Sequence, residues 1–431
     1  MDVVRLNFSH GTQNEHQAVI QNVRHLSREL DKSVAILQDL AGPKVRVGDF
    51  RDGAVNLRVG SSFSLTTLPV EGTPQQVGVS YPGLPKEVKP GDRLLLADGS
   101  IELQAREIFE EEIRCTVLVG GQLGSRKGLN LPSGLFGLPI LSGKDLDDLE
   151  FGLKNGVDFV GLSFVRDAED VRLAKNRVAE SGHKVPVIAK IETQAALNNF
   201  SEILAEADGI MIARGDLSIE TPFAKVPIIQ KQLIREAIRN AKPVITATQM
   251  LWSMVKNPHP TRAEVADVAN AILDGSDAIM LSEETTIGEH PFRAVQAMVS
   301  IARETENAGE ALLGPDSNIP AESTAEAVAR TACDLAERLH VDVIGTVTLS
   351  GQTPRYVAKY RPGQPILAVT TRAETYQRLS LIRGVVPFLL PEKTLNPEEL
   401  IGAAFQMVRH HGWQGKQAVF VSTDRVRKGT I

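Results

Sequence analysis

The sequence predicts an α/β protein built on a TIM-type (β/α)8 barrel, with a small β-barrel domain inserted into it and a C-terminal α/β domain after it. Three observations support this fold class. Strands rich in β-branched residues alternate with helical stretches, polar residues follow the strands, and the pattern changes at two points along the chain. At roughly 150 residues per domain, 431 residues suffice for two to four domains, so a single small binding module is excluded.

The barrel is indicated by seven short strands of buried composition that alternate with helices, as in a parallel sheet. The strands are predicted over residues 3–7, 34–39, 157–164, 185–191, 209–213, 243–248 and 277–281. Apolar residues at helical spacing predict helices over residues 14–30, 168–180, 195–207, 227–241 and 291–307. A further helix begins at Thr261, where Glu264 completes a capping box, and ends at Gly275.

Polar residues stand at the carboxyl ends of all these strands, where a barrel keeps its functional groups. They are Arg5, Asn7, Asp39, Ser163, Lys190, Glu192, Arg214, Asp216, Thr248 and Ser282. An open sheet would concentrate its site at one switch point, so a barrel fits better. Because a closed barrel needs eight strands, we expect the first barrel strand to be absent, leaving unpaired edges near Val3 and Asp277.

The first change of pattern marks the inserted domain, which we assign to residues 44–132. Short alternating segments with turn residues replace the helical spacing there. A hairpin is predicted over residues 93–105, interrupted by Asp98-Gly99, and another strand over residues 113–119. The barrel then comprises residues 1–43 and 133–313.

The second change of pattern marks the C-terminal α/β domain, which we assign to residues 314–431. It opens with another capping box, formed by Ser323 and Glu326, and helices alternate with strands after it. The strands are predicted over residues 341–349, 365–370, 385–390 and 417–422.

Composition and charge exclude several classes of function. The formal net charge is −6 and no basic block stands out, so nucleic acid is not an expected partner. Cys115 and Cys333 lack metal-binding spacing, which excludes a disulfide scaffold and fits a reducing cytoplasm. No apolar run approaches the roughly 20 residues that cross a bilayer, and the first residues lack a secretory pattern. We therefore expect a cytoplasmic protein without a membrane partner.

The most informative stretch is the strand that ends with Lys190, Ile191 and Glu192. Side chains two apart on a strand point the same way, so a cation and a carboxylate share one site. Asp216 follows the next strand, and two carboxylates from neighbouring strand ends suit Mg²⁺, which prefers oxygen ligands. The alternative is a structural ion pair between Lys190 and Glu192, which their place at the functional end of the barrel makes less favoured.

Several other residues have both a functional and a plain interpretation. Gly215 and Asp216 precede a short helix whose free N–H groups suit a phosphate or carboxylate, although a tight turn also explains the glycine. Thr248 can lend a hydroxyl to substrate, while β propensity explains it equally well. His10 is a ligand, a base or a plain turn residue. The basic residues that can reach the same face, unless they are simply solvated, are Arg5, Arg46 and Lys127.

Eight short motifs resemble pyruvate kinases, in the order those enzymes show and over essentially the whole chain. They are Arg5-Leu-Asn-Phe-Ser-His-Gly11, Asp39-Leu-Ala-Gly-Pro-Lys-Val-Arg46, Lys127-Gly-Leu-Asn-Leu-Pro132, Ala189-Lys-Ile-Glu192, Ala213-Arg-Gly-Asp216, Ala247-Thr-Gln-Met-Leu251, Pro260-Thr-Arg-Ala-Glu264 and Met280-Leu-Ser282. One motif alone would be weak, but eight in register with the predicted domains leave little room for chance. The resemblance implies phosphoryl transfer from phosphoenolpyruvate to ADP in glycolysis, giving pyruvate and ATP (EC 2.7.1.40).

The resemblance implies roles for the residues at the strand ends. Glu192 and Asp216 would bind Mg²⁺, while Lys190 would stabilise charge on the phosphoryl group in transit and on the enolate oxygen. Thr248 would lie near the later protonation of enolpyruvate. Substrate contacts are implied for Arg5, at the phosphate, and for Gly215, Asp216 and Thr248, at the carboxylate.

The resemblance also implies contacts with nucleotide, with a monovalent cation and with other subunits. Contacts with ADP or ATP are implied for Asn7, His10, Arg46 and Lys127. A monovalent-cation position is implied at Asn7, Ser9, Asp39 and the carbonyl group of Leu40. Potassium-dependent members carry Glu where this chain has Lys44, whose ammonium can act as the point charge instead, so we predict that K⁺ is not required. Arg262 resembles an intersubunit contact of the family's homotetramer.

Two other functions stay open. A Mg²⁺-dependent barrel lyase or aldolase also stabilises an enolate, although it needs no lid over ADP. We also expect the chain to be truncated relative to the family at both ends, which leaves an inactive paralogue as the second alternative. In the C-terminal domain, residues 348–353 resemble the family's effector loop with Gln352 in place of a frequent Arg, and a plain helix cap by Ser350 or Thr353 explains them equally well.

Overall fold

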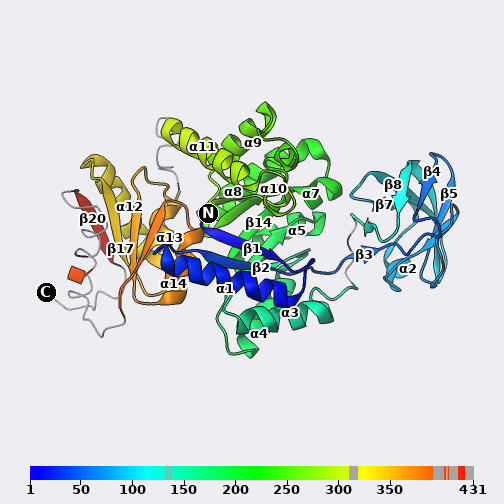
Figure 1. Ribbon diagram of the computed structural model, residues 1–431, viewed down its shortest axis with the longest axis horizontal. Helices are drawn as coiled ribbons and strands as arrows, with labels where there is room; N and C mark the ends of the chain where they lie inside the picture. The colour runs from blue at the N-terminus through cyan, green and yellow to red at the C-terminus, as the bar shows by residue number, and fades with distance from the viewer. Residues whose placement is uncertain are drawn as a thin grey trace.

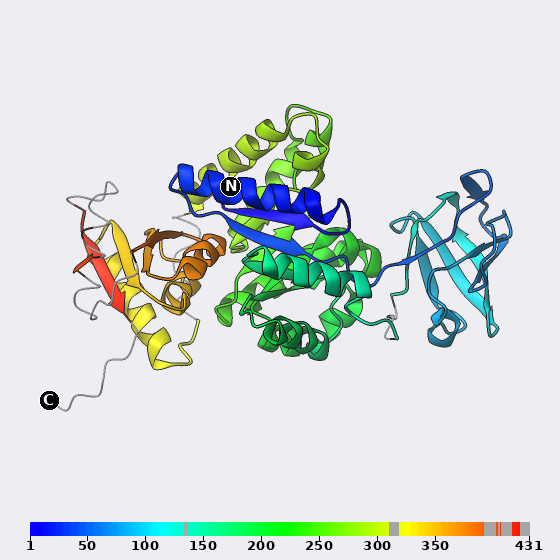
Figure 2. The same cartoon turned by 60° about the horizontal axis from the view of Figure 1, so that its bottom comes forward.

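The computed structural model describes residues 1–132, 134, 137–309, 319–391, 402–403, 406 and 416–422. Its strands form three groups along the long axis of the molecule (Figure 1). A parallel sheet with helices around it lies in the middle, a unit made mainly of β-strands lies on one side, and a smaller parallel sheet lies on the other. Figure 2 shows the same separation from a second direction.

The central sheet has seven strands in the order β1-β2-β12-β13-β14-β15-β16, and every neighbouring pair is parallel. The strands are β1 (Val3–Asn7), β2 (Ala35–Asp39), β12 (Phe159–Leu162), β13 (Val187–Ile191), β14 (Gly209–Ala213), β15 (Val244–Ala247) and β16 (Ala278–Met280). All seven predicted barrel strands are therefore present. Within the described residues, β1 and β16 have no partner on their outer sides and are only partly buried, whereas β2, β12, β14 and β15 are buried throughout.

Helices surround the central sheet (Figure 1). They are α1 (Gln13–Glu29), α3 (Gly143–Lys154), α4 (Ala168–Glu180), α5 (Gln194–Asn198), α6 (Phe200–Glu206), α7 (Arg214–Glu220), α8 (Val226–Arg239), α9 (Arg262–Leu273), α10 (Glu283–Thr286) and α11 (Pro291–Gly309), with the 3₁₀ turns η1 (Phe223–Lys225) and η2 (Trp252–Val255). The helical stretches predicted across residues 195–207 are two short helices, because the backbone at Asn199 (φ −108°, ψ 19°) separates α5 from α6. The capping box of Thr261 and Glu264 is confirmed, and Gly275 follows α9 with a φ of +102° that favours glycine.

The β-rich group, called the β unit below, is inserted between β2 and β12 and has a hydrophobic core of its own. Its elements are β3 (Val45–Arg46), β4 (Ala54–Leu57), β5 (Ser62–Thr66), β6 (Gln76–Gly78), α2 (Leu84–Glu87), β7 (Arg93–Leu96), β8 (Ile101–Ile108), β9 (Glu112–Val119), β10 (Gly121–Gly124) and β11 (Gly128–Asn130). One sheet has the order β3-β11-β7-β8-β9-β5-β6, and β10 pairs with β4. The hairpin expected at Asp98-Gly99 joins β7 to β8, with positive φ at Ala97 and Asp98 as in the tight turns that connect hairpins.

The C-terminal group is a parallel sheet in the order β19-β18-β17-β20. Its elements are α12 (Thr324–Arg338), β17 (Val343–Val347), α13 (Gln352–Lys359), β18 (Ile366–Thr370), α14 (Ala373–Arg378), η3 (Leu379–Leu381), β19 (Val385–Leu389) and β20 (Ala418–Ser422). All four predicted strands are present. The expected boundary at 313/314 lies outside the described residues.

The capping box predicted at the start of α12 is only partly confirmed. Ser323 accepts the N–H of Glu326, but the carboxylate of Glu326 accepts the N–H of Glu322 and pairs with Lys359, so the box is only half formed. At the start of α13 the hydroxyl of Ser350 accepts the N–H of Gln352 at 3.4 Å, which agrees with the interpretation of this loop as a plain helix cap. A second hydrogen bond closes the loop, from the N–H of Gly351, at φ +82°, to the hydroxyl of Thr348.

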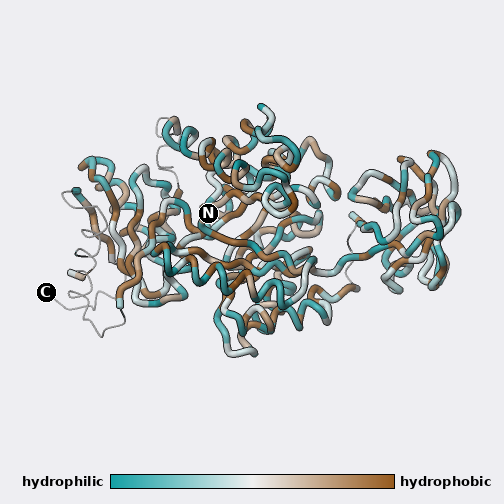
Figure 3. The backbone as a smooth tube through the Cα atoms, in the orientation of Figure 1, coloured by the Kyte–Doolittle hydropathy of each residue, from teal (hydrophilic) through white to brown (hydrophobic). Residues whose placement is uncertain are grey.

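The hydropathy of the chain follows this layering, since apolar residues concentrate on the inner strands and polar residues on the outer helices (Figure 3). The central sheet and the β unit each enclose a separate buried cluster. Among the described residues, no helix combines the length and the apolar character that crossing a membrane requires.

Candidate active site

The carboxyl ends of β2, β12 and β13 bring one lysine together with two acidic residues and a serine. The ammonium group of Lys190 donates a hydrogen bond to the hydroxyl of Ser163 at 2.7 Å. Its Nζ lies 3.3 Å from Oδ1 of Asp39 and 3.5 Å from Oε2 of Glu192. Lys190 and Glu192 thus lie side by side, as the period of two along β13 and the residue after it predicts.

Asp39 links this cluster to the edge strand β1. Both Nε and Nη2 of Arg5 lie 2.6 Å from Oδ2 of Asp39, whose side chain is almost fully buried. Burial alone would raise the pKa of Asp39, but the charges of Lys190 and Arg5 outweigh it and hold this pKa below its usual value. Asp39 is therefore an anion that fixes two cations at the mouth of the barrel.

The charges in the cluster keep Lys190 protonated. Burial opposes this, yet Asp39 and Glu192 together raise the pKa of Lys190 above its ordinary value. The pKa of Glu192 is raised as well, which in its case favours the neutral form. Burial, added to the negative charge of Asp216, raises the pKa of Glu192 to about 7, even though Lys190 and the N–H of Phe164, which donates to Oε1 at 2.7 Å, act against the rise.

Glu192 and Asp216 fit a divalent cation. Oε2 of Glu192 is buried and accepts no hydrogen bond, which is unusual for a carboxylate oxygen in a protein interior. Asp216 stands in the first turn of α7, close enough for its charge to raise the pKa of Glu192. Within the described residues, no group of three or more His, Cys, Asp or Glu side chains is placed to hold a metal. Two carboxylates suit Mg²⁺, which keeps waters and substrate oxygens as its other ligands.

Gly215 and Thr248 meet between α7 and β15, although not as the sequence suggests. The N–H of Gly215 donates to the hydroxyl of Thr248 at 2.8 Å, so the expectation of a free N–H at Gly215 is wrong. Thr248 lies just beyond β15 at a φ of +71°, and its hydroxyl donates to the carbonyl of Ala247. Such a backbone conformation is costly for a threonine and is characteristic of functional sites.

The residues expected to contact nucleotide lie on two separate units. Asn7 ends β1 and His10 lies just after it, where the N–H of His10 donates to the carbonyl of Asn7 in a turn. Arg46 and Lys127 stand at the paired ends of β3 and β11 in the β unit, joined by a hydrogen bond from the N–H of Val47 to the carbonyl of Lys127. Arg46 and Lys127 are both exposed. A ligand that contacts all four expected residues would therefore lie between the barrel and the β unit.

Three of the four residues expected to form the monovalent-cation position, Asn7, Asp39 and Leu40, already use an oxygen for a partner in the protein. The carbonyl of Leu40 accepts from Ser163 at 2.7 Å, and the side-chain oxygen of Asn7 accepts from the N–H of Ser9 at 3.1 Å. Asp39 pairs with Arg5 and Lys190, as described above. Lys44 is exposed, and its stem lies beside β11, where Cε would be 3.4 Å from a Cβ added at Gly128.

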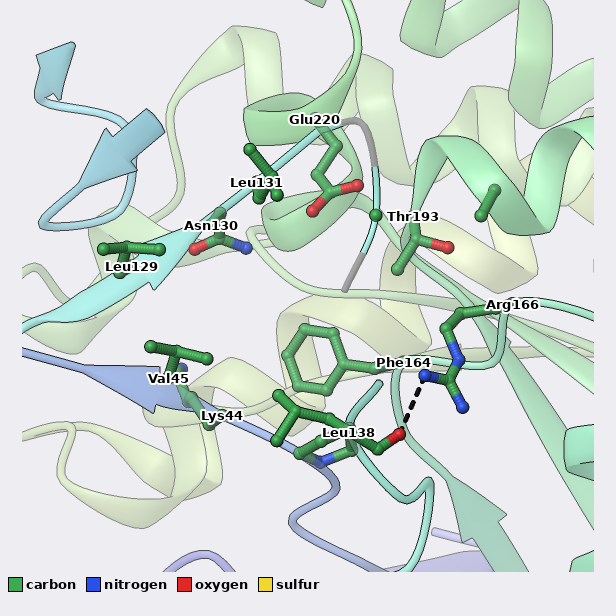
Figure 4. A pocket seen from close by; sticks show the side chains of 13 residues that line it. Lys44, Val45, Leu129, Asn130, Leu131, Leu138, Phe164, Arg166, Thr193 and Glu220 are labelled. Atoms are coloured by element: carbon green, nitrogen blue, oxygen red, sulfur yellow. Dashed lines mark hydrogen bonds between the residues drawn. The ribbon is translucent and has the colours of Figure 1, made fainter. Parts of the chain in front are cut away.

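Ser163 and Glu220 join the site without having been assigned a role in it. The strand-end pattern marks Ser163 only as one polar end among several, but in the structure it bridges Lys190 to the loop after β2. Glu220 ends α7 and lines a small cavity of about 50 Å³ between the β unit and the barrel (Figure 4). Its spacing of four from Asp216 is the one sequence signal that could have placed both on the same helix face.

Comparisons with known proteins agree along the whole chain. The family "Pyruvate kinase, barrel domain" matches residues 1–295, and "Pyruvate kinase, alpha/beta domain" matches residues 326–431. "Pyruvate kinase 2" of Synechocystis is 46% identical over 90% of this chain, which spans 66% of that protein. The pyruvate kinase of Thermotoga maritima is 41% identical over 99% of the chain, which spans 91% of that protein. A crystal structure of a pyruvate kinase from Cryptosporidium parvum superposes with a TM-score of 0.92 at 38% identity, covering 98% of this chain and 88% of its own.

Proposed function

Because this chain belongs to the pyruvate kinase family and shares its phosphotransferase function, we propose that the cluster around Lys190 is where phosphoenolpyruvate passes its phosphoryl group to ADP. The observation that supports this most is the buried ammonium of Lys190, which lies against both Asp39 and Glu192. In the reaction the bond between the phosphorus and the enol oxygen breaks, and a bond to a terminal oxygen of ADP forms. The enolate left behind then takes a proton on carbon and becomes pyruvate.

Lys190 supplies positive charge where negative charge develops. Its raised pKa keeps it protonated at neutral pH, so it attracts the phosphoryl group in transit and the enolate oxygen. Asp39 orients it, and also holds Arg5 where the guanidinium can bind the substrate phosphate. Arg5 is the most exposed member of this set, which suits contact with an incoming ligand.

Glu192 and Asp216 are the residues that would hold Mg²⁺. When bound there, Mg²⁺ supplies positive charge to the phosphate and to the carboxylate side of the substrate. The carboxylate itself is assigned to the backbone of Gly215 and Asp216 and to Thr248. The hydroxyl of Thr248 is then positioned to exchange its hydrogen-bond partner Gly215 for substrate, close to the protonation of enolpyruvate.

The β unit, as residues 44–132, is proposed as a lid over ADP. Arg46 and Lys127 are exposed cations at the paired ends of β3 and β11, and Asn7 and His10 stand at the end of β1 in the barrel. Two basic groups on a separate unit can neutralise the phosphates of ADP only when that unit approaches the barrel. This requirement favours a kinase over a lyase or aldolase, whose substrates carry no second phosphate chain.

We further propose that K⁺ is not required. The position of a potassium ion would lie among Asn7, Ser9, Asp39 and the carbonyl of Leu40, and the ammonium of Lys44 replaces a carboxylate beside it, which weakens cation binding. We expect full activity in Tris buffer without K⁺. Adding K⁺ to roughly 100 mM, where charges more than about 10 Å apart are largely screened, should activate the enzyme less than twofold. Lys44→Glu should introduce a K⁺ dependence. Strong activation of the unmodified enzyme by K⁺ would refute this proposal.

The remaining proposals concern the assembly and the compartment. Arg262 is exposed at the first position of α9, where a homotetramer of the family's kind would use it between subunits. Cys115 and Cys333 are free, buried thiols, which is consistent with a reducing cytoplasm. Sedimentation analysis of the protein and of Arg262→Ala tests the tetramer.

The experiment that tests the reaction is a coupled assay of pyruvate formed from phosphoenolpyruvate, with and without ADP. We expect pyruvate only when ADP and Mg²⁺ are both present, and ATP in equal amount. Pyruvate formed equally without ADP would favour the lyase alternative. No pyruvate under any condition, from protein with a cooperative melting transition, would favour the inactive paralogue.

A further inference from the structure

Glu220, the last residue of α7, touches both the barrel and the β unit. Its Oε2 accepts a hydrogen bond from the N–H of Gln194 at 3.1 Å, at the start of α5 and two residues after Glu192. The side-chain amide of Asn130, in β11, is turned toward the same carboxyl group (Figure 4). One side chain therefore joins the strand end that carries Glu192 to the strand by which the β unit returns to the barrel.

The surroundings of Glu220 disfavour the ionised form of its carboxyl group. Burial, followed by the negative charges of Asp216 and Glu192, raises the pKa of Glu220 to about 7, although the hydrogen bonds from Gln194 and Asn130 act against the rise. Lys44 and Arg166 line the same cavity, but no ion pair joins either of them to Glu220 in the described part of the chain, and Arg166 pairs with Asp170. A residue that served packing alone would be more stable there as glutamine.

The return connection of the β unit is anchored at a second point nearby. Nη1 of Arg166 donates to the carbonyl of Leu138 at 2.9 Å (Figure 4). Between Asn130 and Leu138 the chain passes from the β unit to the barrel, so these two contacts lie at either end of that connection. Lys127 stands only three residues before Asn130, and Arg46 pairs with Gly128 beside it. A movement of Asn130 would therefore also move Lys127 and Arg46, the two residues of the β unit proposed to bind ADP.

We propose that Glu220 is a positioning residue that docks β11 on the barrel and so sets where Lys127 and Arg46 stand over the phosphoryl acceptor. This inference rests on the proposed function of the β unit as a lid. Glu220 contacts neither substrate in this scheme. It acts through Asn130, by holding the lid in the orientation that ADP needs, and through Gln194, by tying that orientation to the strand end of Glu192.

The test compares Glu220→Ala, Asn130→Ala and the double variant in steady-state kinetics. We expect each single variant to raise KM for ADP about tenfold, the worth of one good hydrogen bond to a charged group, and to change KM for phosphoenolpyruvate less than twofold. The double variant should be no worse than the singles, because both remove the same contact. Glu220→Gln keeps one acceptor oxygen and should recover part of the loss. The matched control is Glu202→Ala, an exposed glutamate on α6.

A second measurement does not depend on turnover. Amide hydrogen exchange over residues 128–131, in the protein without substrates, should be faster in Glu220→Ala and Asn130→Ala than in the parent and the control. This arm reports docking even if the parent makes no pyruvate, so failure of the proposed reaction and failure of the docking role are separate results. The proposal is overturned if the two single effects on KM for ADP add, if both substrates are affected equally, or if exchange at β11 is unchanged. A tenfold loss of Mg²⁺ affinity in Glu220→Ala would overturn it too, by making Glu220 a metal ligand.

Discussion

The two ends of the central strands use carboxylates in opposite ways. At the amino-terminal end, an aspartate directly precedes β12, β14 and β16, and each accepts the N–H of a residue at the start of the neighbouring strand. The bonds run from Ile36 to Asp158, from Val187 to Asp208 and from Val244 to Asp277, at 2.6, 2.9 and 3.0 Å. Each aspartate also pairs with a cation, supplied in turn by Arg24, Lys175 and Arg361.

At the carboxyl end Asp39 is paired with Arg5 and Lys190, but Glu192 is not satisfied in this way. Oε2 of Glu192 is buried without a donor, and Lys190 lies 3.5 Å away, engaged by Ser163 and Asp39. At the amino-terminal end, protein N–H groups and cations bind the carboxylates of the three aspartates. At the carboxyl end, one oxygen of Glu192 accepts no hydrogen bond from the protein. The first arrangement stabilises the fold, while the second leaves room for a ligand, as barrels generally divide these tasks between their ends.

The largest expected difference between the two ends of the strands is in kcat, when a lysine at each end is replaced. Lys190→Ala should lower kcat by about 10³-fold or more, because it removes charge that is used chiefly in the transition state. Lys175→Ala, which removes the partner of Asp208 at the other end, should leave kcat within about twofold. Steady-state kinetics on variants with matching circular dichroism spectra decide this. Near-normal turnover in Lys190→Ala would remove that residue from the reaction.

The second prediction concerns the Mg²⁺ dependence of activity, which should change when a carboxylate at the carboxyl end is replaced. Glu192→Gln and Asp216→Asn are expected to raise the Mg²⁺ concentration for half-maximal activity at least tenfold, since each removes a charged ligand. The same variants should lose the rise in melting temperature that Mg²⁺ gives the parent protein. Unchanged Mg²⁺ dependence in both variants would place the metal elsewhere.

At the amino-terminal end of the strands, we expect that replacing an aspartate lowers stability without lowering kcat. Asp208→Ala leaves the buried N–H of Val187 without an acceptor, so we expect the free energy of unfolding to fall by about 1–3 kcal/mol. Its kcat should stay within about twofold of the parent value at a temperature where both are folded. Urea unfolding measures the first quantity. A kcat reduced as strongly as in Lys190→Ala would contradict the division between the two ends.

The smallest effect concerns the pH dependence of stability at the carboxyl end. The pKa of Glu220 is about 7 in the folded protein and ordinary when unfolded, so the folded state binds the proton more tightly. Its contribution to stability is greatest below the unfolded pKa and is lost as the pH rises through 7. Glu220→Gln lacks this loss, and its melting temperature should exceed that of the parent by about 2–4 °C at pH 8 and be nearly equal at pH 5, with chelator present. An equal difference at both pH values would show that Glu220 does not titrate in this range.

Much of this site could be predicted because its signals are local. The period of two on β13 placed Lys190 beside Glu192, and the alternation of strands and helices brought Asp216 to the same end of the sheet. The aspartates of the amino-terminal end also carry a local signal, a single Asp directly before a buried strand, as in Val157-Asp158-Phe159. That signal is ambiguous by itself, because an Asp at this position is equally frequent in a turn.

By itself, the sequence determined the strands, most helices, their order and the chemical character of each strand end, because these depend on periods of two and 3.6 residues along the chain. Only the tertiary structure decided which groups satisfy one another. The pairing of Lys190 with Asp39 joins residues about 150 apart in the sequence. The N–H of Gly215 donates to the hydroxyl of Thr248, and the carboxyl group of Glu220 in the barrel lies against Asn130 in the β unit. Such contacts depend on the crossing of distant strands and on the placement of the β unit, and hydrogen-bond partners at that range leave no periodic trace in the chain.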